Sequence, residues 1–236
     1  MSRIFITGDI HGEHDIQKLS SKAFREGKTL TKQDYLIIAG DFGLVFDQVA
    51  SKSEQYWLQW LTDKPWTTLF IDGNHENFVR LFSDEFSERP MFSDTVKQIT
   101  PSVFYLQRGR VYIIGDRTFF TMGGAPSIDK HQRVPYLSWW PQEEPSHAEW
   151  SNAIEKARSV GSVDYLVTHD TLPAIYNEMH RQNMLAYKQR SPVSEGLWAL
   201  DRHLQYKQAF SGHMHIDKEF ADYRWRILYK DIVEVT

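Results

Sequence analysis

The sequence predicts an α/β protein with parallel strands and helices outside them. Its 236 residues contain five short apolar runs, rich in β-branched or aromatic side chains as buried strands are: 4–7, 35–39, 68–71, 165–168 and 209–210. Helical patterns separate the first four runs, and each run ends at a small polar motif. In folds with this alternation ligands bind beyond the carboxyl ends of the strands, so the motifs are expected to share one edge.

Helices are expected after the first two strands and again after residue 145. In the first helix one face carries Ile16, Leu19, Ala23 and Phe24, and in the second it carries Tyr56, Trp57, Trp60 and Leu61. The second and third helices begin with capping pairs, Ser51 with Glu54 and Ser146 with Glu149.

The middle of the chain has a different pattern. Runs 103–106, 110–114 and 117–122 follow one another closely, which predicts a β-meander with a turn at Gly115 and Asp116. Residues 125–145 contain Trp139, Trp140 and several prolines but little periodicity, so they are interpreted as an excursion from the domain. Short runs around 222–223 predict a closing hairpin.

Composition limits the possible functions. The motifs described below extend from Asp9 to His215, so a single domain covering residues 1–236 is expected. A net charge of −4 gives no basic surface for nucleic-acid polymers, and the absence of cysteine excludes disulfides and thiolate ligands. No apolar run has membrane-spanning length, and a strand beginning at Arg3 leaves no room for a signal peptide, so a cytoplasmic location is expected.

Five polar clusters carry the chemistry. They are DIH at 9–11, GD at 40–41, GNHE at 73–76, a lone His169 and GHMH at 212–215. Carboxylates, imidazoles and an amide are ligands of divalent first-row metals, and a metal pair can hold the attacking and leaving oxygens of a phosphoryl group. Gly-Asp alone occurs three times and means little, and a single histidine is usually structural. GNHE and GHMH are rare, and the ordered set predicts two metal sites.

In this order, the motifs resemble those of the calcineurin-like metallophosphoesterase family, whose pattern runs D-x-H, GD, GNH with an acid, a separate His, and GHxH. The resemblance covers residues 9–215. It implies a sandwich of two mixed β-sheets flanked by helices. It also implies two divalent or mixed-valence ions, for which manganese, iron, zinc, cobalt and nickel are all suited to oxygen and nitrogen ligands.

The resemblance also implies roles for individual residues. One metal would be held by Asp9, His11 and His215, and the other by Asn74, His169 and His213. Asp41 would bridge both ions. His75 would be the catalytic acid or would steady the phosphoryl charge.

One position departs from the family pattern. Many relatives extend the GD motif to GDxxD, in which the later Asp orients the catalytic histidine, whereas this chain has Leu44 there. Asp47 is a possible substitute. The partner that orients His75 therefore stays open.

The favoured function is a binuclear phosphoesterase in which a metal-bridging hydroxide attacks a phosphoester substrate, with a lean to phosphodiesters by analogy with compact relatives. A phosphomonoesterase or protein phosphatase is the alternative. A noncatalytic metal-binding module is less favoured, because every ligand position and His75 hold suitable residues. In the excursion, Lys130 and Arg133 are candidates to contact an anionic substrate, and the two tryptophans are expected to pack the loop.

Overall fold

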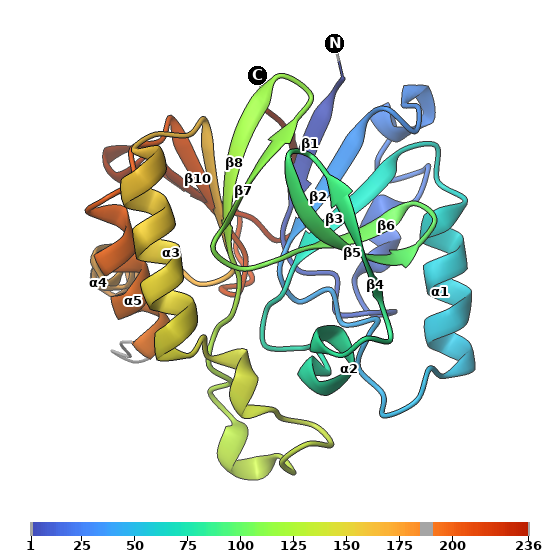
Figure 1. Cartoon of the computed structure of the whole chain (residues 1–236), viewed down its shortest axis with the longest axis horizontal. Coiled ribbons are helices and arrows are strands. Elements are labelled where there is room, and N and C mark those ends of the chain that lie inside the picture. Colours follow the sequence, from blue (N-terminus) through green and yellow to red (C-terminus); the bar gives the residue numbers. More distant parts are fainter. Residues whose placement is uncertain (1, 185–190, 236) are drawn as a thin grey trace.

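The computed structural model describes residues 2–184 and 191–235, and it confirms a sandwich of two mixed sheets flanked by helices (Figure 1). The first sheet has the order β13-β1-β2-β3-β6-β5-β4. Its strands are β1 Ile4–Thr7, β2 Tyr35–Ala39, β3 Thr67–Ile71, β4 Ser87–Met91, β5 Asp94–Thr100, β6 Val103–Leu106 and β13 Ile232–Glu234. Strands β1, β2, β3 and β6 are parallel, as the βα alternation predicted for the first three.

The second sheet has the order β11-β12-β10-β9-β8-β7. Its strands are β7 Arg110–Ile114, β8 Arg117–Met122, β9 Tyr165–Thr168, β10 Gln208–Ser211, β11 Lys218–Phe220 and β12 Trp225–Ile227. Strands β11 and β12 form the predicted antiparallel closing hairpin, and β8, β9, β10 and β12 are parallel.

Alternating side chains of the central strands divide the molecule into three apolar layers. In β1, Ile4 and Ile6 enter the core between the sheets, while Phe5 faces the helices. In β9, Val167 belongs to the inner core and Leu166 to the outer one. Because successive side chains of a strand point to opposite faces, each sheet has one apolar face toward the other sheet and one toward the helices.

The helices lie on the two outer faces. Helix α1 (Lys52–Thr62) covers the first sheet, and α3 (His147–Val160), α4 (Pro173–Arg181) and α5 (Pro192–Asp201) cover the second (Figure 1). Helix α2 (Phe78–Phe82) follows the GNHE motif. None of the helices in the described part of the chain is long and apolar enough to cross a lipid bilayer.

The predicted capping box is confirmed in full at α3 and only in half at α1. At α3, Ser146 and Glu149 form the complete reciprocal capping box. At α1, the Ser51 side chain accepts the Glu54 N–H, but the Glu54 carboxylate instead binds the buried guanidinium of Arg80 at 2.7 and 2.8 Å. The buried face of α1 consequently carries Glu54, Leu58 and Leu61, and Tyr56 is exposed.

The helix expected around residues 16–24 is wrong. Two 3₁₀ turns, Ile16–Leu19 and Glu26–Thr29, take its place. Ser20 is extended, and its side chain accepts the Ala23 N–H, an alternative to the helical ladder that serine favours. Ile16, Leu19 and Phe24 are still buried. The spacing of apolar residues therefore identified the buried side chains correctly but not the type of helix.

The predicted three-stranded meander is also wrong. β7 and β8 form a hairpin turning at Gly115, but β6 belongs to the other sheet, where it pairs with β3 and β5. All four residues of β6 are buried, as a strand covered on both faces requires, whereas β7 alternates. The short link between β6 and β7 therefore crosses between the sheets, which its length alone does not reveal.

Several elements were not predicted from the sequence. The hairpin of β4 and β5 turns at Phe92 and Ser93, which have φ of 58° and 66° without any glycine to signal the turn. In α5, a Cβ on Gly196 would lie 2.4 Å from Trp150, so this glycine permits close packing of α5 on α3. A glycine inside a helix weakens the periodic signal.

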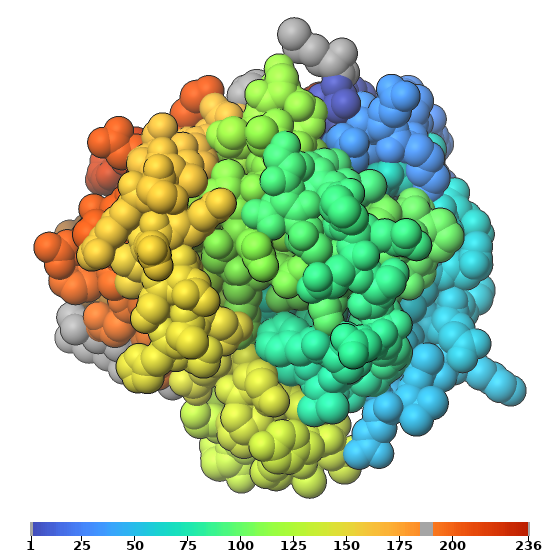
Figure 2. All heavy atoms as spheres, in the orientation of Figure 1, coloured from blue at the N-terminus to red at the C-terminus, as the bar shows by residue number. Residues whose placement is uncertain are grey.

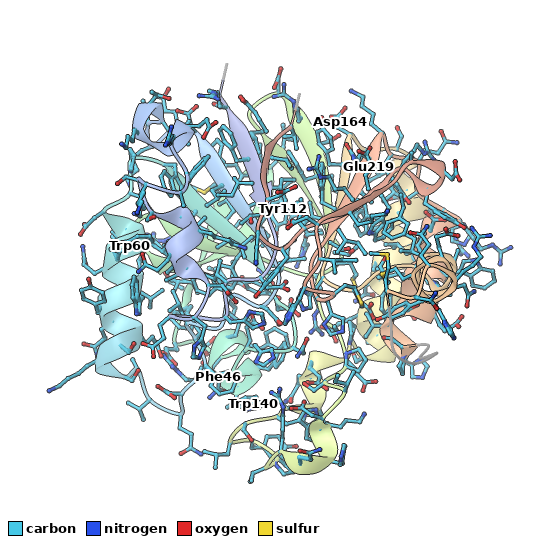
Figure 3. All side chains as sticks on the ribbon, turned by 180° about the vertical axis from the view of Figure 1, so that it is seen from behind. Phe46, Trp60, Tyr112, Trp140, Asp164 and Glu219 are labelled. Carbon is cyan, nitrogen blue, oxygen red and sulfur yellow. The ribbon has the colours of Figure 1, made fainter. Side chains whose placement is uncertain are left out.

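The excursion of residues 125–145 protrudes at the lower edge of the molecule (Figure 2). It contains two 3₁₀ turns, Lys130–Gln132 and Pro141–Glu143. Trp140 is buried against Phe46 with ring centroids 5.3 Å apart, and these two side chains lie together at its junction with the domain (Figure 3). The indole N–H of Trp139 binds Glu143 at 2.6 Å. Both tryptophans therefore pack the loop, as expected.

A buried ion pair after β3 provides a test of the fold. Arg108 donates to Asp72 at 2.6 and 2.9 Å, and both side chains are almost fully buried. Arg108→Ala leaves an uncompensated carboxylate and should lower the free energy of unfolding in urea by about 3–5 kcal/mol. The control Arg110→Ala removes an exposed pair with Asp94 and should cost less than about 1 kcal/mol. Equal losses in the two variants would contradict this account.

Candidate metal centre

The polar motifs meet where the carboxyl ends of the two sheets converge. Hydrogen bonds join the strand ends across the gap: His169 Nδ1 lies 2.9 Å from the Ala39 carbonyl oxygen, and the Gly212 N–H donates to the His169 carbonyl at 3.1 Å. The His213 N–H donates to both carboxylate oxygens of Asp9, at 3.0 and 3.1 Å. The motif positions after β1, β2, β3, β9 and β10 are thus neighbours in space, as expected from their places at strand ends.

Two groups of side chains could each hold a metal ion, and they share one residue. The first contains Asp9, His11, Asp41 and His215, and the second contains Asp41, His169 and His213; within each group the ligand atoms lie within 4.8 Å of one another. One oxygen of Asp41 lies 3.1 Å from His11 Nε2 and the other 3.1 Å from His169 Nε2. A carboxylate placed in this way can reach an ion on either side.

The GNHE loop adds Asn74 and His75 to the centre. Their backbone N–H groups both donate to Asp41 Oδ1, at 2.8 and 2.9 Å. The Asn74 side-chain oxygen lies 3.3 Å from His169 Nε2, which places it beside the second group. His75 Nε2 lies 4.0 Å from Asp41 Oδ2. The other seven residues that the motifs nominated are therefore gathered around Asp41.

Backbone strain is concentrated at these residues. His11, Asp41, His213 and His215 all have positive φ, between 44° and 66°, which non-glycine residues rarely adopt. The GHMH segment is therefore not an extended strand, and its two histidines reach different groups. Such conformations cost of order 1–3 kcal/mol each and cluster at functional sites.

Glycines allow the motifs to approach one another. A Cβ on Gly73 would lie 2.2 Å from Asp41 Oδ1, and a Cβ on Gly212 would lie 2.1 Å from Asp9 Oδ1. Neither distance is compatible with a side chain. The glycines that precede Asn74 and His213 are thus a steric requirement of the site.

Burial and nearby charges strongly shift the pKa values of three histidines. Burial opposes protonation of His169, but the charges of Asp41 and Asp9 dominate and raise its pKa to about 10. Burial likewise opposes protonation of His11, but its hydrogen bond to Asp41 raises its pKa to about 9. Burial, assisted by the charge of His169, lowers the pKa of His213 to about 3. A cation must displace the protons on His11 and His169, so its affinity rises with pH.

Three residues outside the nominated set hold the motifs in place. Glu76 accepts the Phe42 N–H at 2.8 Å and the Gly73 N–H at 3.1 Å, and burial raises its pKa to about 8. Lys18 donates to the Asp9 carbonyl at 2.7 Å, and Asp15 lies 2.8 Å from His11 Nδ1. Glu76 is part of the GNHE motif, but no feature of the sequence predicted the contacts of Glu76, Lys18 or Asp15.

His75 has a different environment from the one its family pattern suggests. Leu44 is buried in the apolar core, and Asp47 uses its backbone carbonyl to accept from Asn77 and Arg80. In the part of the chain that the structure describes, no ion pair joins the Asp47 side chain to His75. Burial lowers the pKa of His75, against the opposing charge of Asp41. The neutral imidazole is thus favoured.

Two hollows open on the centre. Counted with the space open to solvent, the larger has a volume of about 1090 Å³ and the other about 780 Å³. The larger shares Asp41, Asn74, His213 and His215 with the metal groups; its other lining residues are His75, Pro126, Ile128, Asp129, Arg133, Tyr176, Ser191 and Met214. The other is lined by His11, His14, Asp15, Gly43, Phe46, His75 and His215. His75 and His215 stand between the two hollows.

The excursion supplies one wall of the larger hollow. Arg133 lines it and is held by Asp129 at 2.7 Å, whereas Lys130 pairs with Glu144 at 3.0 Å. Another lining residue, Tyr176, donates its hydroxyl to the buried Asp170 at 2.8 Å, so Asp170 holds part of this wall in place. Of the two cations predicted to face a substrate, Arg133 is the one that lines this hollow.

Comparison with known proteins identifies the family. The family model for calcineurin-like phosphoesterases matches residues 2–217. The chain belongs to this family. It is a metal-dependent phosphoester hydrolase. Solved structures that match this phosphoesterase include phosphopantetheinyl hydrolase from Mycobacterium tuberculosis, with 15% identity over 97% of this chain and 88% of that chain and a TM-score of 0.47. Comparison with curated proteins gives no significant match.

The glycine contacts predict how this phosphoesterase responds to one added methyl group. Gly73→Ala must push the loop away from Asp41, so the purified variant should retain less than half of the wild-type metal content by elemental analysis. The control Gly161→Ala also adds a Cβ, but that atom meets nothing within 4 Å and lies at the end of α3. If Gly73→Ala kept the wild-type metal content, the close approach would not be required.

Proposed function

We propose that the protein is a binuclear phosphoesterase whose seven ligands are those nominated by the motifs. Asp9, His11 and His215 hold one ion, Asn74, His169 and His213 hold the other, and Asp41 bridges them. The observation that carries this proposal is the sharing of Asp41 by two groups of donors that both line the same hollow.

The donor set fits two first-row divalent or mixed-valence ions. It offers carboxylate oxygen, imidazole nitrogen and one amide oxygen, and manganese, iron, zinc, cobalt and nickel all accept such ligands. Bound there, two ions supply charge neutralisation and a water that ionises near neutral pH. The strained ligands are already gathered around Asp41, which reduces the ordering that binding requires.

His75 and Arg133, which line the hollows beside the metal groups, can bind the substrate and protonate the leaving group. His75 lies between the two hollows, so its imidazole can orient the substrate. An anionic phosphoester bound beside it would raise its lowered pKa and favour the protonated form that can donate to the leaving oxygen. Arg133 presents a guanidinium to the larger hollow and suits a phosphate oxygen. No serine or other side-chain nucleophile is needed in this scheme.

A phosphodiester is the favoured substrate class. Its phosphorus carries two organic groups, and the centre is flanked by two hollows that meet at His75 and His215. One substituent can therefore enter each hollow. A phosphomonoester would fill one hollow and leave the other to water, and it is the alternative.

A matched pair of substrates separates these possibilities. After reconstitution with Mn²⁺, kcat/KM is measured for 4-nitrophenyl phosphate and for bis(4-nitrophenyl) phosphate, which share a leaving group. We expect the diester to be hydrolysed at least tenfold more efficiently. A preference for the monoester would reject the diester proposal, and inactivity on both with two bound ions would reject the binuclear phosphoesterase.

His75→Gln should retain both metals and lower kcat by on the order of 10² to 10⁴, the range for loss of a general acid. The loss should shrink as the leaving group improves, because a good leaving group needs less protonation. The control is His147→Gln, which changes an exposed histidine at the start of α3. Equal losses for good and poor leaving groups would instead assign His75 to charge stabilisation.

Arg133→Ala should raise KM about tenfold, equivalent to about 1.4 kcal/mol, because a charged donor to the substrate is lost. Metal content should not change. Lys130→Ala removes another cation of the excursion, one that pairs with Glu144, and should leave KM unchanged. Unchanged KM in Arg133→Ala would show that its guanidinium does not contact substrate.

A further inference from the structure

Asn74 poses an orientation problem, because its side-chain amide has an oxygen end and a nitrogen end of nearly equal size. Only the oxygen is a metal ligand. The structure places Oδ1 beside His169 Nε2 at 3.3 Å, and Nδ2 points away toward Ser127. A neighbouring group must therefore stabilise this orientation of the Asn74 amide relative to the one with oxygen and nitrogen exchanged.

That contact comes from the excursion. Asn74 Nδ2 donates to Ser127 Oγ at 3.3 Å, and the Ser127 hydroxyl donates in turn to Glu143 Oε2 at 2.6 Å. The other oxygen of Glu143 accepts the Ser127 N–H at 2.7 Å and the Trp139 indole N–H at 2.6 Å. Two of these bonds form a chain of fixed direction, from Asn74 through the Ser127 hydroxyl to the Glu143 carboxylate, and the other two hold that carboxylate in place.

The direction of this chain decides the orientation of Asn74. An ionised carboxylate only accepts, so the single hydroxyl proton of Ser127 is committed to Glu143, and its oxygen is left as an acceptor. A flipped Asn74 would bring its own oxygen against that acceptor. All three side chains are buried, with 6% or less exposed, so water cannot relieve the mismatch.

We propose that Glu143 and Ser127 form a positioning relay that fixes the Asn74 amide with its oxygen toward the second metal site. The relay rests on the proposed function, because it presumes Asn74 as a ligand. It gives the excursion a role beyond lining the substrate hollow. The same segment does both, since Pro126 and Ile128, which flank Ser127, line that hollow.

Glu143→Gln tests the relay with almost no change in shape. The Gln oxygen can still accept from Trp139 and from the Ser127 N–H, but its NH₂ now donates to Ser127 Oγ. The hydroxyl proton is then free to turn toward Asn74, and the preference for one orientation is lost. The control is Glu144→Gln, the same chemical change one residue later, where the side chain pairs with Lys130.

The readout is Mn²⁺ binding by isothermal titration, with stoichiometry checked by elemental analysis. We expect Glu143→Gln and Ser127→Ala to weaken one of two Mn²⁺ equivalents by about tenfold or more, the usual effect of losing a group that orients a ligand. Glu144→Gln should match the wild type. If Glu143→Gln bound both Mn²⁺ equivalents with wild-type affinity, the relay alone would be overturned. If the wild-type protein bound fewer than two Mn²⁺ equivalents, the proposed function would be overturned as well.

A second background separates positioning from simple structural support. The variant Asn74→Asp carries two equivalent oxygens at this position, so the orientation of the side chain cannot matter. We expect Glu143→Gln to weaken Mn²⁺ binding when it is made in the wild-type chain and to cause no loss when it is combined with Asn74→Asp. The relay would be overturned if Glu143→Gln lowered the Mn²⁺ affinity equally in both backgrounds. It would also be overturned if the loss of affinity accompanied a lower midpoint of thermal unfolding.

Discussion

The buried carboxylate of Asp41 is the interaction on which the rest of the site depends. Its backbone carbonyl accepts the N–H groups of Ile10 and His11 at 3.0 and 2.9 Å, and its side chain accepts those of Asn74 and His75. Two of the other motifs, DIH and GNHE, are therefore attached to this one residue. A lone carboxylate would not remain ionised at this depth, but the adjacent His169 and other imidazoles hold its pKa well below the usual range despite burial.

The sandwich provides the stability that this arrangement requires. Left-handed backbone at four nominated ligands is unfavourable locally, and so are several buried acids. They persist because the strands before the left-handed ligands, β1, β2 and β10, are almost entirely buried. The inner core between the sheets brings the end of β9 beside the end of β2, where His169 contacts the Ala39 carbonyl. Convergence of two sheets, more than any single loop, sets the spacing of the donors.

The excursion completes the site from outside the sandwich. Trp140 anchors it on Phe46, Arg133 faces the larger hollow, and Ser127 reaches Asn74. The same loop thus contacts a proposed metal ligand and the proposed substrate. A segment that varies in length or sequence could change substrate preference without disturbing the motifs, but only if the residues at its two ends, near Ser127 and Glu143, are kept.

The sequence by itself determined the chemistry of the donors, their places at strand ends and the central parallel strands, because these depend on local motifs and on a period of two in the apolar runs. It could not determine that β6 belongs to the first sheet, that residues 16–29 form 3₁₀ turns, or that Phe92 and Ser93 turn a hairpin. Only the tertiary structure decided the contacts of Glu143 and Arg133. Ser127 connects Glu143 to Asn74, and Arg133 lines the same hollow as His213. These pairs are distant in the chain, so hydrogen-bond direction and burial exist only once the fold brings them together.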